Sequence, residues 1–247
     1  FQLCHINKLQ IDTSIVLNIY EDHIDWHSSF EEYADSKLKI FNFTVNDQNN
    51  FLGSVDEELN INDALLENIT VVEDINNYFL PNYFDEFVSM FVAICRRFEI
   101  SEMDVIEFLS SEPSAEHRFE LFYSKNGVNF INDSKSTNLE SVNKASLKVN
   151  NCMLIMHGLA KGINPNKLVL SDEIKAILVP QNSEFDVSMF KSIVIKYESI
   201  EDLQQLIKEN YRNFNTVLFS CGGSSFSDFK NYVDRGIYFK KMIVGEI

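Results

Sequence analysis

From about residue 114 onward, short apolar runs rich in β-branched residues alternate with stretches of helical periodicity. This alternation constrains the fold strongly, because parallel strands need long crossover connections and helices usually supply them. The pattern therefore predicts an α/β domain with a mainly parallel sheet. The expected strands cover residues 118–123, 128–132, 152–158, 176–180, 192–197 and 216–220, and the expected helices cover 138–149, 200–210 and 225–243.

The first 113 residues show a less regular pattern. A β-branched run at 14–20 predicts a buried strand, and residues 41–80 mix short strand-like pieces with acidic loops. The pattern breaks at 111–116, which contains Pro113, and this break predicts two domains, 1–113 and 114–247. Helices are expected at 30–40 after a capping Ser28 or Ser29, at 84–98 as a buried helix, and at 101–109 after a capping Ser101.

The composition excludes several classes of protein. The 247 residues carry 21 Lys and Arg against 37 Asp and Glu, a net charge of −16, whereas nucleic-acid binding requires a basic surface. The four cysteines form no C-x-x-C pair, which favours reduced thiols over disulfides or a zinc site. No apolar run reaches the roughly 18 residues of a membrane span. We therefore expect a cytoplasmic protein with neither a nucleic-acid nor a membrane partner.

Four polar clusters stand where expected strands end: Glu-Asp-His at 21–23, Asn-Asp-Ser-Lys-Ser-Thr-Asn at 132–138, His-Gly-Leu-Ala-Lys-Gly at 157–162 and Ser-Cys-Gly-Gly-Ser-Ser at 220–225. In open α/β sheets ligands bind beyond the carboxyl ends of the strands. The clusters are therefore candidate parts of a ligand site.

Each cluster has a functional and a structural interpretation. Ser224 and Ser225, at an expected helix start after two glycines, could bind an anion with backbone N–H groups, or could simply cap the helix. Lys161 could reach the same anion, or lie on the surface. His23 could be a metal ligand or a structural histidine, and Lys37 could be solvated. Together these residue types suit phosphoryl-transfer chemistry, although no G-x-x-x-x-G-K-[ST] loop is present.

Taken in order, the clusters resemble motifs of the Mur ligases. The matching segments are N-x-x-E-D-H at 18–23, D-S-K-L-K-I at 35–40, H-R-F-E at 117–120, N-D-S-K-S-T-N at 132–138, H-G-L-A-K-G at 157–162 and the run from Ser220 to Gly236. The resemblance extends from residue 1 to about 243 and is strongest to the members that add D-glutamate. It implies the C-terminal portion of a central ATP-binding domain at 1–113, followed by a Rossmann-like amino-acid-binding domain at 114–247.

The resemblance also implies an activity. Such an enzyme is an ATP-dependent ligase of peptidoglycan precursor synthesis, which joins D-glutamate to UDP-N-acetylmuramoyl-L-alanine through an acyl phosphate. ATP and two Mg²⁺ ions are the expected cofactors, and a monomer is the expected state.

Site residues follow from the matched motifs. Arg118, Asp133 and Asn82 are expected to contact ATP. His23 and Lys37 are the expected catalytic metal ligands, with Lys37 carbamylated so that its cationic amine becomes an anionic oxygen ligand. The residues expected around D-glutamate are Lys135, Thr137, Lys161, Ser225 and Tyr232.

The chain also departs from the family pattern. The UDP-binding N-terminal domain and the P-loop are lacking, so we expect a fragment that is inactive without the missing N-terminal part of the same protein. The segment 80–86 is altered, His157 replaces a glycine, and Cys221 replaces a proline, which suggests a thiol-sensitive site. Two alternatives remain, a non-catalytic amino-acid-binding module and a sister ligase that adds another amino acid.

Overall fold

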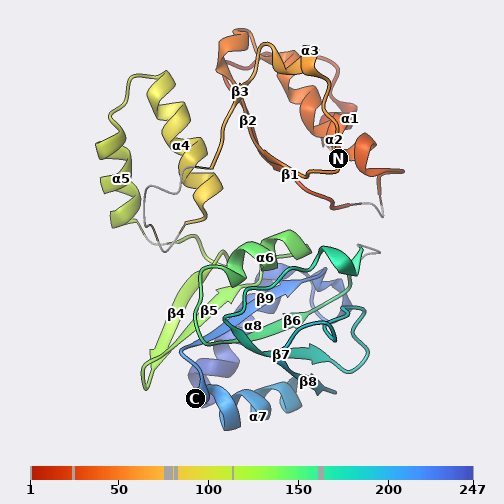
Figure 1. Ribbon diagram of the computed structural model, residues 1–247, viewed down its shortest axis with the longest axis vertical. Coiled ribbons are helices and arrows are strands. Elements are labelled where there is room, and N and C mark those ends of the chain that lie inside the picture. The colour runs from red at the N-terminus through yellow and green to blue at the C-terminus, as the bar shows by residue number, and fades with distance from the viewer. Residues whose placement is uncertain are drawn as a thin grey trace. The chain divides into compact units, whose positions relative to one another are not determined.

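A computed structural model describes residues 2–23, 26–74, 80, 83–112, 114–160 and 164–246 (Figure 1). The chain divides into two compact units, residues 1–113 and 114–247. Each unit has its own sheet, and each buried hydrophobic cluster lies within one unit. Among the described residues no helix is long and apolar enough to cross a membrane.

The second unit is built on a six-stranded sheet in the order β4-β5-β9-β6-β7-β8, in which only β4 is antiparallel to its neighbour. The strands are β4 (Glu120–Lys125), β5 (Val128–Asp133), β6 (Cys152–His157), β7 (Ile174–Pro180), β8 (Ile193–Tyr197) and β9 (Thr216–Gly222). Every residue of the central strands β6 and β9 is buried, as expected for parallel strands that are covered on both faces. The predicted α/β fold and its six strands are confirmed.

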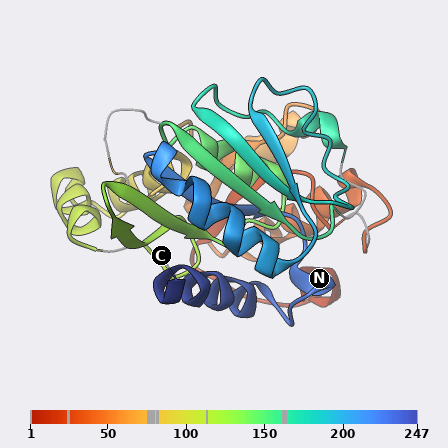
Figure 2. The same cartoon turned by 90° about the horizontal axis from the view of Figure 1, so that it is seen from below.

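Helices cover both faces of this sheet. Apolar residues of α7 (Ile200–Asn210) and α8 (Tyr232–Glu246) pack in one core with Phe130, Met153 and Phe219. On the other side, α6 (Leu139–Ser146) buries Leu139, Val142 and Ala145 against β9. Figure 1 shows α6 and α7 on opposite sides of the sheet, and Figure 2 shows α7 crossing in front of the strands. Short 3₁₀ turns are η3 (Pro165–Lys167), η4 (Tyr211–Asn213) and η5 (Ser225–Ser227).

The predicted helix at 225–243 was wrong at its beginning. Residues 225–227 form only the 3₁₀ turn η5, and α8 begins at Tyr232. The side chain of Asn231 accepts a hydrogen bond from Asp234 N at 2.9 Å and thereby caps the helix at that point. The expected binding of an anion by a helix start at Ser224 and Ser225 therefore has no helix behind it.

The first unit contains a three-stranded parallel sheet, β1 (Ser14–Ile19), β2 (Asn50–Val55) and β3 (Thr70–Val71). Helix α2 (Phe30–Leu38) packs on it and is capped by Ser29, whose hydroxyl accepts a hydrogen bond from Glu32 N. Ser101 stands at the predicted cap position of α5 but makes no side-chain hydrogen bond there. The remaining elements are α1 (Gln2–His5), η1 (Lys39–Phe43), η2 (Asp47–Asn49), α3 (Asp63–Leu66), α4 (Asp85–Arg97) and α5 (Glu102–Ser111).

Candidate active site

Three of the four polar clusters meet at one edge of the second sheet. Strands β5, β9 and β6 are parallel neighbours, so their carboxyl ends lie side by side. Gly222 N donates to Ser136 O at 3.1 Å. Leu159 and Ser224 exchange two backbone hydrogen bonds of 3.1 and 2.8 Å. The turns at 132–138, 157–160 and 220–225 are therefore joined by their backbones, and the fourth cluster, 21–23, belongs to the other unit.

Arg235 of α8 holds the three turns together. Its side chain is fully buried, and its guanidinium donates to three carbonyl oxygens, Ser134 O at 2.8 Å, His157 O at 2.9 Å and Gly223 O at 3.0 Å. Each carbonyl comes from a different turn. No carboxylate forms an ion pair with Arg235 in the part of the chain that the structure describes. The guanidinium is thus a fixed spacer between the turns, since its planar fork reaches several acceptors at once.

The space around Arg235 is tightly filled. Gly158 has φ +117°, and a Cβ there would overlap Ser224 O and come within 2.9 Å of Arg235 Nη1. A side chain at Gly158 would therefore be strained and would also displace the guanidinium. Position 158, directly after the last residue of β6, therefore requires glycine.

Asp133, the last residue of β5, is a buried acid. Its carboxylate accepts hydrogen bonds from Phe119 N at 3.0 Å and from Ser220 Oγ at 2.7 Å. Burial raises the pKa of this carboxyl from 3.8 to about 7, although the two hydrogen bonds and the charges of Arg118 and Arg235 oppose the shift. Asp133 is therefore poised to change its charge near neutral pH.

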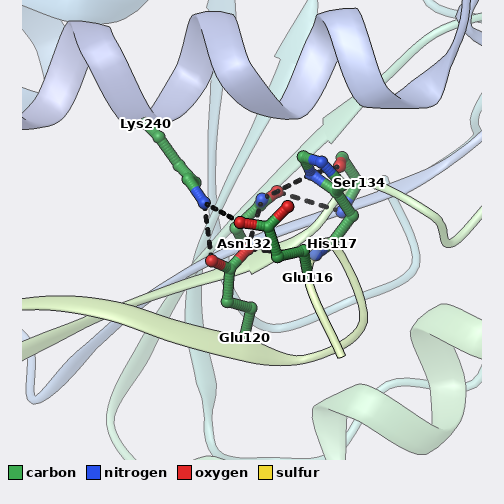
Figure 3. A network of polar contacts seen from close by, with 6 residues as sticks. All are labelled: Glu116, His117, Glu120, Asn132, Ser134 and Lys240. Carbon is green, nitrogen blue, oxygen red and sulfur yellow. Dashed lines mark hydrogen bonds and ion pairs between the residues drawn. The ribbon is translucent and has the colours of Figure 1, made fainter. Parts of the chain in front are cut away.

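A second polar network, drawn in Figure 3, includes Asn132 and Ser134, the neighbours of Asp133 along the chain, and Glu120 of β4. Asn132 Nδ2 contacts His117 Nδ1 and Glu120 Oε2, both at 3.0 Å, and Ser134 Oγ lies 3.2 Å from His117 Nδ1. Lys240 of α8 donates to Glu120 Oε1 at 2.6 Å, as Figure 3 shows. Although burial raises the pKa of the Glu120 carboxyl, hydrogen bonds from His117 N, Lys240 and Asn132 outweigh it and lower that pKa.

The network fixes the segment that carries Arg118. His117 and Phe119 adopt left-handed backbone conformations, with φ +67° and +49°. Such conformations are strained for residues other than glycine and persist only where surrounding contacts stabilise them. The hydrogen bonds of His117 and the bond from Phe119 N to Asp133 supply that stabilisation. Arg118 itself is exposed, and its charge acts on Asp133. The structure thus brings two of the expected ATP contacts together, while Asn82 lies outside the described residues.

Lys135 and Tyr232 form the clearest pair among the residues expected around D-glutamate. Lys135 Nζ lies 4.9 Å from the centroid of the Tyr232 ring, and the Lys135 backbone N donates to His117 O at 3.0 Å. Thr137 is half-buried in the same turn as Lys135, and Ser225 is buried at the start of η5. Lys161 lies outside the described residues. A lysine ammonium beside hydroxyl groups is suited to a carboxylate ligand.

The first unit places His23 and Lys37 on one cavity. The cavity has a volume of about 240 Å³ and is lined by Gln2, Leu3, His23, His27, Tyr33, Ser36 and Lys37. Lys37 Nζ donates to Asn18 O at 2.9 Å and lies 4.9 Å from the centroid of the Tyr33 ring. Burial lowers the pKa of the Lys37 amine, and the charges of Asp22 and Glu86 oppose this effect. A neutral amine is the nucleophilic form of lysine.

His23 occupies an unusual backbone position, with φ +58°. Its backbone N–H donates to Asp22 Oδ1 at 2.8 Å, and its ring Nε2 lies 3.7 Å from Asp22 Oδ2. The described residues contain no group of three or more His, Cys, Asp or Glu side chains that could hold a metal ion. His23 and a carbamylated Lys37 would supply two ligands, which suits Mg²⁺, since this ion usually keeps water and phosphate oxygens as its other ligands.

The structure corrects the expectation of a thiol-sensitive Cys221. This residue is fully buried in β9, and burial raises the pKa of its thiol to about 12. A buried thiol that stays protonated is a poor nucleophile. Cys221 therefore belongs to the apolar core below the turns rather than to a reactive site.

Arg235 received no role from the sequence, although a signal was present. Residues 235, 239, 242 and 243 recur at helical spacing and share one face, and the other three positions are Phe239, Met242 and Ile243. An arginine among apolar residues on a core-facing stripe is a charge that must find acceptors. The acceptors themselves are backbone carbonyls, which no residue type reveals.

The sequence of this chain is similar to a known protein family and to known ligases. Residues 2–77 match the family described as the Mur ligase middle domain. The chain is 28% identical to the UDP-N-acetylmuramoylalanine–D-glutamate ligase of Thermosipho africanus and 30% identical to that of Pseudothermotoga lettingae, over 98% of its own length in both cases. It spans only 60% and 62% of the length of these two curated relatives.

Solved structures show the same fold at low sequence identity. The MurF ligase of Thermotoga maritima, in complex with ADP, matches 89% of this chain and 58% of its own with a TM-score of 0.61 and 11% identity. MurF of Acinetobacter baumannii matches 93% of this chain and 58% of its own with a TM-score of 0.60 and 13% identity. The arrangement of strands and helices in this chain is therefore that of Mur ligases.

Replacement of Arg235 tests its role as the spacer. We expect Arg235→Lys to destabilise the second unit by at least about 2 kcal/mol, because one ammonium cannot reach all three carbonyls and leaves buried acceptors unpaired. The free energy of opening is measured by hydrogen exchange of the β9 amides. The exposed Arg212→Lys is the matched control and should change it by no more than about 0.5 kcal/mol. Equal values for both variants would refute the spacer role.

Asp133 should make stability depend on pH. Its folded pKa of about 7 lies above the unfolded value of 3.8, so its contribution is complete below about pH 4 and is lost as the pH rises through 7. Asp133→Asn removes this titration while keeping an oxygen for Phe119 N. We expect the opening free energy of the wild type, relative to that of Asp133→Asn, to be highest near pH 4 and to fall as the pH rises to 7. A constant difference would contradict the raised pKa.

Proposed function

We propose that this chain, which resembles the Mur ligases over 98% of its length and has their fold, is part of an ATP-dependent ligase that joins D-glutamate to UDP-N-acetylmuramoyl-L-alanine. Residues 114–247 would bind the amino acid, and residues 1–113 would form the C-terminal portion of the ATP-binding domain. The observation that carries the proposal is the joined set of three turns, where Lys135 of the turn at 132–138 lies over the ring of Tyr232 at the start of α8.

The turns offer the chemistry that a dicarboxylic amino acid needs. Lys135 supplies a cation, and Thr137, Ser225 and Tyr232 supply hydroxyl groups, while Lys161 would add a second cation. Each carboxylate of the ligand accepts several hydrogen bonds, so a cation beside hydroxyl donors matches it well. Arg235 keeps these donors at fixed spacing, which lowers the cost of ordering them when the ligand binds.

The proposed reaction has two steps. ATP first transfers its γ-phosphoryl group to the alanyl carboxylate of the sugar nucleotide, and the amine of D-glutamate then attacks the acyl carbon and expels phosphate. Arg118, near Asp133, would bind nucleotide phosphate charge as an exposed cation, with Asn82 as a further contact. Bound Mg²⁺ would stabilise the negative charge of the transferring phosphoryl group.

The cavity of the first unit suits carbamylation of Lys37. In that reaction the neutral amine attacks the carbon of CO₂, forms an N–C bond and releases one proton, which leaves an anionic carbamate. The lowered pKa of Lys37 favours the neutral amine that reacts. The product would place an oxygen ligand on the same cavity as His23, so that the two side chains could hold Mg²⁺ together.

Phosphate release from ATP by the full-length protein tests the proposed reaction. We expect release only when UDP-N-acetylmuramoyl-L-alanine and D-glutamate are both present, because the amine must capture the acyl phosphate. L-glutamate and other amino acids serve as controls. Activity with another amino acid would point to a sister ligase, and D-glutamate binding without phosphate release would point to a non-catalytic binding module.

Lys135 should carry much of the affinity for the amino acid. Loss of a charged hydrogen-bond donor costs about 1.5–3 kcal/mol, so Lys135→Ala should weaken D-glutamate binding about 10- to 100-fold in calorimetry. Lys175→Ala is the matched control, because Lys175 is an exposed lysine near the start of β7. If both variants bind as wild type does, Lys135 is not a ligand of the amino acid.

Lys37→Ala in the full-length protein should lower the rate of phosphate release about 100-fold, since an oxygen ligand for the metal is lost. Added acetate or formate should restore part of the rate by taking the place of the carbamate. Lys39→Ala, in the turn after α2, is the control and should keep its rate. An active Lys37→Ala protein would rule out the carbamate.

A further inference from the structure

His157 is the last residue of β6, and its imidazole is buried, with 7% of the side chain exposed. The imidazole makes two polar contacts, and one of its partners makes a third. Nδ1 lies 2.8 Å from Tyr197 Oη, Tyr197 Oη lies 3.0 Å from Met156 O, and Nε2 lies 3.2 Å from Asp228 Oδ2. His157 stands where the family pattern has glycine, and it has no part in the proposed reaction.

The direction of each hydrogen bond follows from counting protons. Met156 O is a carbonyl and can only accept, so the single proton of the Tyr197 hydroxyl points to it. Tyr197 Oη must then accept from His157, and Nδ1 carries the proton of that bond. Burial raises the pKa of Tyr197, so the hydroxyl keeps its proton throughout the neutral range. Tyr197 thereby fixes the Nδ1–H tautomer of a neutral His157.

In that tautomer Nε2, the other ring nitrogen of His157, carries no proton. Nε2 is buried and has no hydrogen-bond partner among the described residues, while the Asp228 carboxylate stands at ion-pair distance. A bare nitrogen facing a carboxylate sets two lone pairs against each other. One additional proton on Nε2 would turn this repulsion into an ion pair across the 3.2 Å that separate Nε2 and Asp228 Oδ2.

We propose that His157 and Asp228 form a proton-dependent latch, closed when Nε2 binds a proton and open when it releases that proton. The latch joins the turn at 157–160 to the segment between η5 and α8, which contains Asp228. Both segments flank residues proposed to contact the amino acid, so the latch positions them. The proton-dependent pairing itself does not depend on the ligase reaction, and only its effect on the amino-acid site rests on the proposed function.

The charged groups around His157 set the range in which the latch works. Burial and the charge of Arg235 on α8 lower the pKa of the His157 imidazole, and the Asp228 carboxylate opposes them. Cys221 of β9 stays neutral, because burial raises the pKa of its thiol to about 12. Asp228 is half-exposed, so water can replace His157 as its partner when the latch opens. The latch therefore opens in neutral solution and closes as the solution becomes acidic.

Nuclear magnetic resonance of the ¹⁵N-labelled imidazoles tests the tautomer. The chain has five histidines, and loss of one set of signals in His157→Gln identifies the set of interest. At pH 8, in EDTA, we expect the proton on Nδ1 in the wild type and on Nε2 in Tyr197→Phe, where Nδ1 loses its acceptor. A proton on Nε2 in the wild type at pH 8 would overturn the proposal.

Titration of the same signals tests the pairing. We expect Asp228→Asn to shift the His157 midpoint to lower pH, because the charge is lost and the new amide can donate to the bare Nε2. Asp186→Asn, an exposed acid elsewhere in the unit, is the matched control and should leave the midpoint unchanged. Equal midpoints in wild type and Asp228→Asn would also overturn the proposal.

Hydrogen exchange of the amides at 226–231 tests whether the pair acts as a latch. Below the wild-type His157 midpoint these amides should exchange more slowly in the wild type than in Asp228→Ala, whose side chain cannot pair with Nε2, and at pH 8 the two proteins should exchange alike. Equal exchange below the midpoint would show that the proton binds without joining the segments and would overturn the latch. Asp228 is half-exposed, so this variant keeps the fold in which the comparison is made.

Discussion

The hydrogen bonds of Arg235 to three carbonyls are the interaction on which the site depends. Hydrogen bonds between neighbouring strands bring the strand ends of a parallel sheet close together. They do not hold the turns that follow, because each turn leaves the sheet. A buried guanidinium meets an acceptor from each turn and so extends the order of the sheet beyond its last hydrogen bond. The charge is distributed over carbonyl dipoles instead of being neutralised by one acid, which leaves the nearby acid Asp133 available for other chemistry.

The electrostatics of the site follow from the depth at which each group lies. Asp133 and His157 are both buried at strand ends, and burial shifts their pKa values in opposite directions, upward for the acid and downward for the base. Both shifts favour the uncharged form. Lys135, which is only half-buried, lies against the face of the Tyr232 ring. Apart from the buried guanidinium of Arg235, whose charge is shared among carbonyls, the site therefore carries its positive charge at the rim, where a charged ligand would arrive.

Much of the fold could be predicted because it depends on side-chain pattern. The apolar runs 128–132, 152–158 and 216–220 became β5, β6 and β9 with bounds shifted by at most two residues, since a buried parallel strand needs continuous apolar residues. The start of α8 was missed because Asn231 and Ser225 are equally good caps on residue type, and the choice depends on the tertiary position of Arg235. Lys135 and Tyr232 could be expected in one site, but their contact could not, because it depends on the path of η5.

The separation of the hydrophobic clusters between the two units has a consequence for cooperativity. The cluster around Phe130 and Phe219 contains residues of the second unit alone, and the cluster around Ile19 and Leu52 contains residues of the first alone. Loss of one unit's core removes no contact from within the core of the other unit. A stress that opens the core of the unit with Lys37 therefore breaks no contact within the core of the unit with Lys135.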